Sequence, residues 1–365
     1  MPKTRDVESF GRGVEDRLVA LSPLDPDAAN SVDSLVRAMG ETAFGGRRLG
    51  EAADVLEAMV RDPDCFVVVT ISGAMTIAKQ GVLLCEMIER GWVNAVVTTG
   101  ALMTHGLTEG TGRLHFKHRP DMSDEELYSK GYNRVYDTIE LERSLDDIET
   151  MLHEILQAHP DDEVLSSHAI TRAIGSHLKA NVPERAILTS AVNHDVPIYV
   201  PAFTDSELGL DFAIHNRLRD RDGRPPIRFD PFLDLDDFTE RIRRQKSLGI
   251  FTIGGGVPRN WAQQVGPYLD ILQLRLGIDE EIQRYRYAVR ICPEPEHWGG
   301  LSGCSYSEGV SWGKFVPPSE GGRFAEVFAD ATIAWPLLVR AVMERTDSTA
   351  GSPVSEDDRS PRTPR

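Results

Sequence analysis

The alternation of apolar, strand-like runs with helical stretches is the feature that most restricts the fold of this chain. The run CFVVVTISGAM at 65–75 is rich in β-branched residues and ends in small ones, and the segment 77–91 that follows it has helical spacing. The next run, WVNAVVTTGAL at 92–102, again ends in small residues. The order strand, helix, strand predicts a βαβ unit, and therefore a parallel sheet.

The same pattern recurs in the second half of the chain. Short strands are expected in PIYVPA at 197–202 and in IFTI at 250–253, which runs into three glycines. The runs YRYAVRI at 285–291 and FAEVF at 324–328 add further strands. Together these stretches predict roughly six to seven strands in a Rossmann-like, doubly wound, mostly parallel α/β sheet that forms a single large domain.

Composition divides the chain into three parts. Residues 1–50 are mixed, with a helix expected near Ala28–Met39, and are predicted to form an N-terminal helical extension. Residues 51–345 hold the strand–helix pattern and are predicted to be the nucleotide-binding domain. Residues 346–365 have almost no apolar content, which predicts a disordered C-terminal tail.

Charge and apolar content limit the class of partner. The chain has 365 residues and a net charge of -17, which argues against nucleic-acid binding and is compatible with cationic ligands, or with an ordinary acidic protein. No window approaches the roughly 18 apolar residues of a membrane span. The N-terminus MPKTRDVESFGRG lacks an apolar signal segment, so a cytoplasmic location is expected.

Motifs for metals, disulfides and hydrolytic nucleophiles are missing from the sequence. Cys65, Cys85, Cys292 and Cys304 lie far apart with no CxxC pair, so neither a zinc ribbon nor a disulfide framework is indicated. The histidines do not have metal-ligand spacing, and no GxSxG sequence occurs. Hydrolase interpretations therefore have little support.

Small residues follow four of the expected strands, in the segments 72–76, 98–102, 204–209 and 254–257. Loops of this kind let backbone N–H groups approach phosphates at the carboxyl edge of an α/β sheet. They predict a dinucleotide site there. The alternative is that these glycines only make turns, since no GxGxxG motif is present.

The nine residues SEGVSWGKF, at 307–315, hold the most unusual combination of side chains. Lys314 could act as a nucleophile through an imine if burial keeps its amine neutral. Trp312 could wall such a pocket, and Glu308 could bind an ammonium or move a proton. The alternative interpretation is an exposed lysine at a strand end beside a tryptophan of the core.

Six ordered segments resemble the deoxyhypusine synthase family across about residues 40–345. They are VNAVVTTGALMTHGL, KGYNRVYDT, VPAFTDSELG, FTIGGGV, SWGK with its preceding glutamate, and FADATIAWPLLV. The resemblance implies a Rossmann-like fold, a homotetramer with active sites at dimer interfaces, and NAD as cofactor. It also implies oxidation of spermidine by hydride transfer to NAD, with the aminobutyl group held as a lysine imine before transfer to a protein lysine.

The resemblance also assigns residues to roles. Lys314 matches the covalent carrier, Trp312 the wall against the aliphatic chain, and Glu308 the partner of an amine. The positions that match NAD contacts of the family are Gly73, Ala74, Met75, Thr76, Thr98, Thr99, Gly100, Asp205, Gly255, Gly256, Asp330 and Ala331.

The chain departs from the family at three positions that bind the amine. Leu210 and Leu301 replace acids, with Ser302 following the second, and Asn260 replaces a histidine. Each broken charge pair is expected to remove roughly 3–5 kcal/mol of favourable pairing. Spermidine should therefore bind weakly unless nearby acids take over, and a less cationic donor would suit the leucines better. The acids that could do so are Asp211, Glu207, Glu294 and Glu296.

Three functions are compatible with these residues. The first is an NAD-dependent aminobutyl-type transferase acting through a Lys314 imine, whose acceptor is a protein lysine or a small amine such as putrescine, the latter giving homospermidine. The second is a non-catalytic family member that binds NAD or a partner chain. The third is an ordinary dehydrogenase, which ranks last because no His/Asp or Tyr/Lys catalytic pair is evident.

Overall fold

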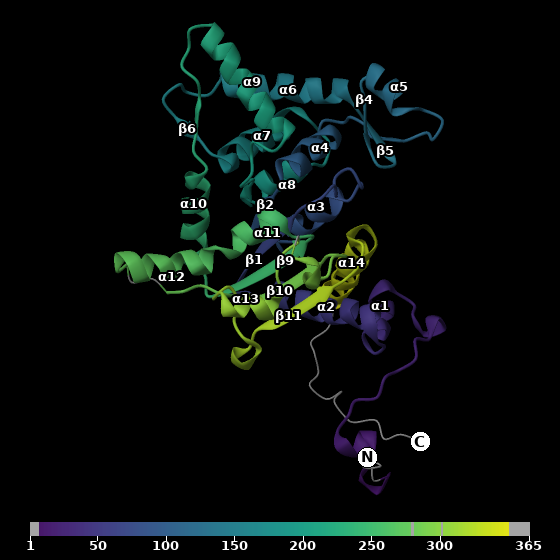
Figure 1. Ribbon diagram of the computed structural model, residues 1–365. Helices are drawn as coiled ribbons and strands as arrows, with labels where there is room; N and C mark the ends of the chain where they lie inside the picture. The colour runs from purple at the N-terminus through teal and green to yellow at the C-terminus, as the bar shows by residue number, and fades with distance from the viewer. Residues whose placement is uncertain (1–6, 279–280, 301, 350–365) are drawn as a thin grey trace, which may run out of the picture.

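A six-stranded parallel sheet forms the centre of the molecule (Figure 1). The computed structural model describes residues 7–278, 281–300 and 302–349. The strands of this sheet are β1 (Cys65–Ile71), β2 (Ala95–Thr98), β7 (Ile198–Tyr199), β9 (Ser247–Ile253), β10 (Tyr285–Ile291) and β11 (Arg323–Val327). All of their pairings are parallel. The predicted α/β fold is thus confirmed.

The strand order is that of a doubly wound sheet. It reads β11-β10-β9-β1-β2-β7 across the sheet, so the chain runs outward in one direction from β1 and then returns to start again at β9. The two halves meet where Ile71 of β1 pairs with Ile253 of β9. In such sheets the crevice at the carboxyl ends of these two strands is the usual place for a ligand.

Helices cover both faces of the sheet, which explains why β9 is buried along its whole length and lacks polar alternation. The α-helices are α1 (Val32–Gly40), α2 (Phe44–Arg61), α3 (Gly81–Glu89), α4 (Gly100–Gly110), α5 (Asp124–Ser129), α6 (Glu142–Gln157), α7 (Ser167–Asn181), α8 (Ile187–Asn193), α9 (Glu207–Arg221), α10 (Phe232–Ile242), α11 (Gly256–Gln263), α12 (Val265–Leu276), α13 (Tyr306–Ser311) and α14 (Ala331–Thr349). One core lies under α2, α3 and α14 and continues among the helices of the upper part of Figure 1. The other lies under α10 to α13.

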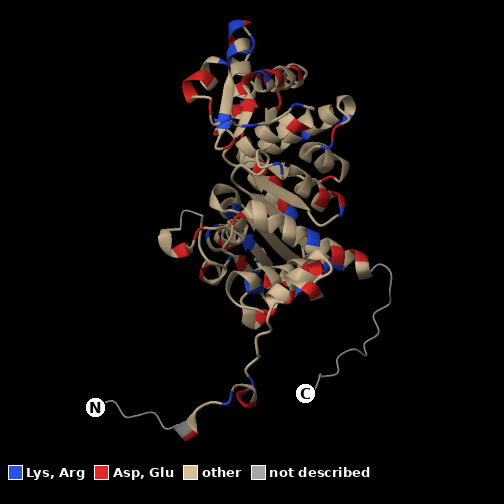
Figure 2. Cartoon of the chain, turned by 90° about the vertical axis from the view of Figure 1, so that its right-hand side faces the viewer, with Lys and Arg blue, Asp and Glu red and all other residues tan. Residues whose placement is uncertain are grey.

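Two small sheets lie in the segments between β2 and β9. The strands β3 (Phe116–Lys117), β4 (Tyr132–Val135) and β5 (Thr138–Leu141) are antiparallel, and β6 (Val164–Leu165) pairs in parallel with β8 (Arg228–Phe229). Here α6 and α9 pack side by side. Charged residues of both signs are interspersed over this part and over the main sheet (Figure 2).

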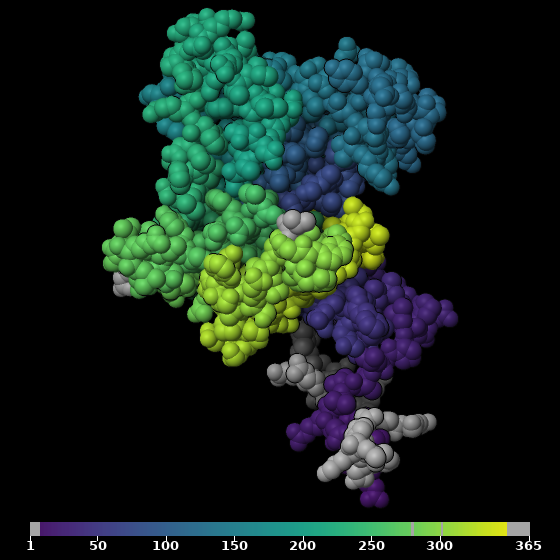
Figure 3. Space-filling model, viewed as in Figure 1, coloured from purple at the N-terminus to yellow at the C-terminus, as the bar shows by residue number. Residues whose placement is uncertain are grey.

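The N-terminal segment leaves the body of the molecule (Figures 1 and 3). Between residue 7 and α1 it contains only short 3-10 turns, at Val7–Ser9, Gly13–Asp16 and Pro26–Ala28. The helix expected near Ala28–Met39 is α1, which begins after Ser31, the residue that caps it. Helix α2 continues across residue 50, and the predicted boundary there stays a prediction.

The predicted tail begins too early. Residues 346–349 belong to α14, so disorder at these four positions is wrong. An ion pair of 2.8 Å joins Arg90, the residue after α3, to Asp347 near the end of α14. The rest of the predicted tail, residues 350–365, lies outside the described residues.

Two further features bear on the expectations from composition. Cys65, Cys85, Cys292 and Cys304 are all free thiols; Cys85 and Cys292 are buried, and burial raises the pKa of Cys65 to about 12. Within the part of the chain that the structure describes, no helix has both the length and the apolar character needed to cross a bilayer.

Candidate active site

Two glycine-containing loops, 72–76 and 254–257, meet at the carboxyl ends of β1 and β9. The N–H of Gly255 donates to Oγ of Ser72 at 3.0 Å, and the N–H of Ser72 donates to the carbonyl of Ile253 at 3.1 Å. These bonds follow from the parallel pairing of the two strands, which brings both loops to one edge of the sheet. We call them the glycine loops.

Open space lies beside two of the predicted cofactor glycines. Gly73 and Gly256 have φ angles of 83° and 62°, a region that favours glycine. A Cβ built on Gly256 meets nothing within 4 Å, and one on Gly73 meets only the Met75 side chain at 4.0 Å. A dinucleotide could therefore approach the backbone at both loops, which fits the chemistry of an NAD site. Ala74 is exposed beside Gly73.

Two other predicted cofactor glycines are explained by packing. A Cβ on Gly255 would lie 1.7 Å from the carbonyl oxygen of Ser302, and one on Gly100 would lie 2.1 Å from Oγ of Ser206. In both places another segment crosses the glycine too closely for any side chain. Gly255 thus brings the segment that starts at Ser302 onto the end of β9.

The predicted threonines join neighbouring loops. Thr76 donates to the carbonyl of Leu102 at 3.0 Å, and Thr98 donates to the carbonyl of Ile71 at 3.1 Å. Thr99 caps α4 by accepting from the Leu102 N–H at 3.2 Å. These bonds hold the ends of β1 and β2 in register. A role in cofactor binding stays a prediction for all three.

Asp205 and Asp330 differ in their surroundings. Asp205 is exposed in the turn after β7, and its carboxylate forms no hydrogen bond or ion pair within the described residues. It does not cap its own turn, and it stays available to a ligand. Asp330 accepts from the Thr332 N–H at 2.8 Å and so caps α14, with Ala331 buried behind it.

Lys314 is buried, and its amine donates to Oδ1 of Asn260 at 3.2 Å. Only 7% of the residue is exposed. Its carbonyl accepts from the N–H of Tyr285, which starts β10, so its backbone lies at the far end of that strand from the glycine loops. Helix α11 connects the two places: Asn260 stands four residues after Gly256, about 6 Å along the helix axis.

The surroundings of Lys314 favour a neutral amine. Burial is the largest effect and lowers the pKa of Lys314. Cys304 acts next and opposes it, Arg259 lowers the pKa further, and Glu308 raises it least. Among the described residues Lys314 forms no ion pair. A neutral, partly shielded amine next to an amide oxygen is a competent nucleophile for imine formation.

Trp312 and Glu308 are exposed, whereas Lys314 is buried. Trp312 is 64% exposed, and Glu308 is exposed on the short helix α13. Gly313, with a φ of 69°, turns the chain between Trp312 and Lys314, so the indole faces outward while the lysine faces inward. The alternative of an exposed lysine and a core tryptophan is therefore wrong. The role of Trp312 as a pocket wall is not met within one subunit and stays a prediction.

The structure describes two of the three positions that depart from the family. Leu210 is 54% exposed on α9, and Asn260 is the partner of Lys314. Leu301 lies outside the described residues. Ser302 is half-buried, and its Oγ accepts from Nη2 of Arg290 at 3.3 Å. This bond holds Ser302 next to the end of β10.

None of the four acids proposed as replacements forms an ion pair with Lys314 in the described residues. Asp211 is buried on the α6 side of α9, where burial, and then Glu207 and other acids, raise its pKa to about 7. Burial also raises the pKa of Glu207. Glu296 faces Glu326, and the Glu294 carbonyl accepts from Arg290. Asp211 in particular does not replace the acid missing at Leu210.

Sequence reasoning missed a buried network around a carboxylate that bonds to side chains of α4. Glu140 of β5 accepts from Thr108 and contacts Nδ1 of His105 at 2.6 Å and Nε2 of His115 at 3.2 Å. Burial would raise its pKa, but these hydrogen bonds outweigh burial and lower it to about 2. The sequence feature that could have indicated this network was His105, inside the segment VNAVVTTGALMTHGL.

Arg259 was also missed, although it follows the glycine loop directly. It is 2% exposed, and its guanidinium lies over the ring of Tyr306 at 5.1 Å. We refer to Arg259, Asn260, Glu308, Trp312 and Lys314 together as the Lys314 site. A charged residue two positions after a strand-end glycine loop was the only sequence signal for it.

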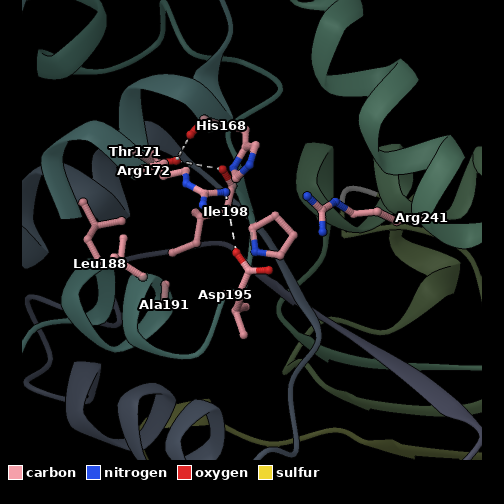
Figure 4. Close-up of a pocket in the computed structure, with 11 residues that line it drawn as sticks. His168, Thr171, Arg172, Leu188, Ala191, Asp195, Ile198 and Arg241 are labelled. Carbon is pink, nitrogen blue, oxygen red and sulfur yellow. Dashed lines mark hydrogen bonds and ion pairs between the residues drawn. The ribbon is translucent and has the colours of Figure 1, made fainter. Parts of the chain in front are cut away.

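A separate cavity of about 310 Å³, including its open mouth, lies beside β7 (Figure 4). Arg172, Asp195, His168 and Arg241 surround it, with an apolar wall formed by α8. Arg172 and Asp195 form an ion pair of 3.5 Å. Strand β7 is at the edge of the sheet, three places from β9, so this cavity is distinct from the glycine loops.

Comparison with known proteins gives one consistent family. A family model described as deoxyhypusine synthase matches residues 34–342. The chain is 32% identical over 317 residues to a protein named probable deoxyhypusine synthase 2 from Methanosarcina acetivorans, covering 87% of this chain and 88% of that one. It is 30% identical over 314 residues to a deoxyhypusine synthase-like protein from Chlorobaculum parvum, covering 85% of each. A crystal structure of a candidate deoxyhypusine synthase from Entamoeba histolytica has a TM-score of 0.58 at 14% identity, covers 89% of this chain and 97% of its own, and supports the fold alone.

Proposed function

Since the chain belongs to the deoxyhypusine synthase family, we propose that it is an NAD-dependent transferase that carries an aminoalkyl group on Lys314. The observation that carries this proposal is the buried amine of Lys314, which has an amide oxygen as its partner and no ion pair in the described residues. An inert structural lysine at this depth would be expected to hold a carboxylate.

The reaction transfers the R–CH2 group of a donor R–CH2–NH–R′ to an amine acceptor. A hydride leaves the carbon beside the donor nitrogen, and that C–N bond becomes an imine. Lys314 adds through Nζ to the imine carbon, the bond to the donor nitrogen breaks, and R′–NH2 leaves with a proton. An acceptor amine then displaces Lys314 in the same way, and a hydride returns to the carbon to give the product amine.

A bound NAD supplies the chemistry of this hydride exchange. The glycine loops have the open space for it at Gly73 and Gly256, and Asp205 is an exposed acid in the turn after β7. Asn260 orients the Lys314 amine by accepting its hydrogen bond, and burial keeps water away from the imine. In this proposal Glu308, which is exposed, exchanges protons with solvent.

The acceptor in this proposal is an amine, either a protein lysine or a small molecule such as putrescine. Leu210 and Asn260, both uncharged, support a donor with fewer positive charges than spermidine. The assembly proposed is a homotetramer. The apolar side chains on α12, where Leu274 and Leu276 are 76% and 67% exposed, support burial of that helix against another subunit.

The proposal is tested by the first half-reaction. The purified chain is mixed with NAD and a single amine, without acceptor, and NADH absorbance is followed. We expect NADH to form in proportion to enzyme sites for at least one amine. Because Lys314 acts after the hydride step, Lys314→Ala should still form NADH but should hold no borohydride-stable aminoalkyl group, whereas Lys246→Ala, an exposed lysine paired with Asp64, should behave as wild type in both. NADH that accumulates over many turnovers without acceptor would instead show an ordinary dehydrogenase.

A second candidate function is a non-catalytic NAD-binding family member. The exposed position of Trp312 favours it, because the subunit alone does not enclose the Lys314 amine on that side. It predicts that NAD binds with ordinary affinity while no amine reduces it. It also predicts that Lys314→Ala leaves cellular function unchanged.

A further inference from the structure

Arg259 is a buried cation for which the described chain supplies no anion. Four arginines are at most 3% exposed: Arg219, Arg259, Arg290 and Arg345. Arg219 pairs with Asp161 at 2.6 Å, Arg290 with Glu326 at 3.7 Å, and Arg345 with Asp54 at 2.7 Å and with two further acids. Arg259 forms no ion pair with any described residue, and its Nε and Nη2 atoms are buried without a hydrogen-bond partner.

The guanidinium of Arg259 belongs to the Lys314 site. Arg259 and Asn260 are neighbours on α11, and Asn260 holds the Lys314 amine. On the other side Arg259 lies over Tyr306, which packs edge-on against Phe315 at 4.9 Å, the residue that follows Lys314. The cation therefore lies near the nucleophile, where α11 meets α13.

The guanidinium of Arg259 occupies the space beside Gly303. A Cβ built on Gly303 would lie 2.5 Å from Nη1 of Arg259, so a side chain there would displace the guanidinium. The ring of Tyr306 gives a cation–π contact, which is weaker than a carboxylate pair. Burying a guanidinium with two unbonded nitrogens is unfavourable, so a ligand oxygen in contact with them would be strongly stabilised.

We propose that the donor taken at the Lys314 site carries a carboxylate, and that Arg259 binds it. This inference rests on the proposed transferase function and adds the charge of its substrate. A planar guanidinium with free donors matches a carboxylate in geometry and charge. The neutral Asn260 and the exposed Leu210 offer no charge that would repel one. The carboxylate takes no part in bond making, so the transfer reaction balances as before.

The experiment compares amines that differ by one carboxylate. Putrescine is compared with ornithine. Spermidine is compared with its analogue that has a carboxylate on the terminal carbon of the aminopropyl arm, the carbon that bears the primary amine. Each is incubated with the NAD-loaded chain and borohydride, and the modified fraction of the Lys314 peptide is measured against amine concentration. The wild-type chain should be half-modified at a concentration about ten- to one-hundred-fold lower for the carboxylated member of at least one pair.

Variants test whether Arg259 causes the preference for the carboxylated amine. Arg259→Gln should abolish the preference while still forming adducts, and Arg259→Lys should keep part of it. Arg323→Gln, an exposed arginine on β11, should behave as wild type. If Arg259→Gln does not fold, the wild-type comparison decides alone: equal or better trapping of the plain amines overturns the inference and leaves the proposed function standing.

Two other results are also decisive. If Arg259→Gln loses NAD affinity and keeps the wild-type preference between amines, Arg259 binds a phosphate of the dinucleotide and the inference is overturned. If no amine of either pair modifies Lys314 in the wild-type chain, the proposed function fails, and the inference fails with it.

Discussion

The amine of Lys314 donates its hydrogen bond to the amide oxygen of Asn260, 3.2 Å away, and not to a carboxylate. This pairing explains how a lysine can be almost fully buried and still be reactive. A carboxylate at that distance would fix the ammonium form and block imine formation, whereas an amide orients the amine without charging it.

Asn260→Asp should therefore impair the Lys314 site by raising the pKa of the lysine. We expect the pH at which imine formation is half-maximal to rise by about one unit or more, because a facing anion favours the ammonium. Borohydride trapping measures the imine at each pH. Gln264→Asp, at the exposed residue that follows the last residue of α11, is the matched control and should leave the pH profile unchanged. A profile unaltered in Asn260→Asp would show that the contact does not govern the nucleophile.

Gly256→Ala should weaken NAD binding more than it weakens the fold. Its φ of 62° makes alanine unfavourable by about 1 kcal/mol, and the methyl group would enter the open space beside the glycine loop. Gly277→Ala has a similar φ of 66° and equally open surroundings, but it lies at the end of α12. Urea unfolding should give similar losses for both, and NAD titration a loss only for Gly256→Ala. Equal NAD affinities would remove Gly256 from the site.

Glu140→Gln should destabilise the fold at neutral pH by about 2–4 kcal/mol, since it removes a buried anion bonded to two histidines and a threonine. The folded pKa of about 2 is below the unfolded value, so this stability is fully present above about pH 4.3 and is lost as pH falls through the folded value. Unfolding free energies of the two proteins should converge toward pH 2. A constant difference at all pH values would contradict the pKa.

Asp211→Asn should stabilise the protein in alkaline solution. The folded pKa of Asp211, about 7, is above the unfolded value of about 3.9, so the wild-type chain loses stability as pH rises between them, and the loss is complete above the folded pKa. The variant should have a flatter profile and be more stable at pH 8 by about 1–3 kcal/mol. Leu210→Asn, its exposed neighbour, should keep the wild-type slope. An unchanged slope in Asp211→Asn would show that this carboxyl is ionised throughout.

The sheet could be predicted from sequence because its signal is local and repeated. β1 and β9 are unbroken apolar runs ending in small residues, and two such runs separated by helices have few other ways to be buried. The positions of Gly73 and Gly256 followed from the same rule, since the carboxyl ends of parallel strands share one edge. Sequence periodicity could not distinguish a glycine beside open space from one that another segment contacts closely. Gly255 and Gly100 are of the second kind.

The directions of side chains in the Lys314 site were beyond sequence reasoning. One residue on a helix changes the direction of a side chain by about 100°, which is why Asp211 cannot stand in for Leu210. The outward turn of Trp312 depends on the positive φ of Gly313. The burial of Arg259 depends on α13 folding over α11, a contact between segments more than forty residues apart. The end of α14 likewise depends on a distant partner, Arg90.

The most direct test of the account is the mass of the Lys314 peptide after the NAD-loaded protein has been incubated with an amine donor and reduced with borohydride. The account predicts an aminoalkyl group on Lys314, dependent on NAD and absent from Lys314→Ala. Modification of a different lysine, or an unmodified Lys314 with every amine while NAD is bound, would contradict it.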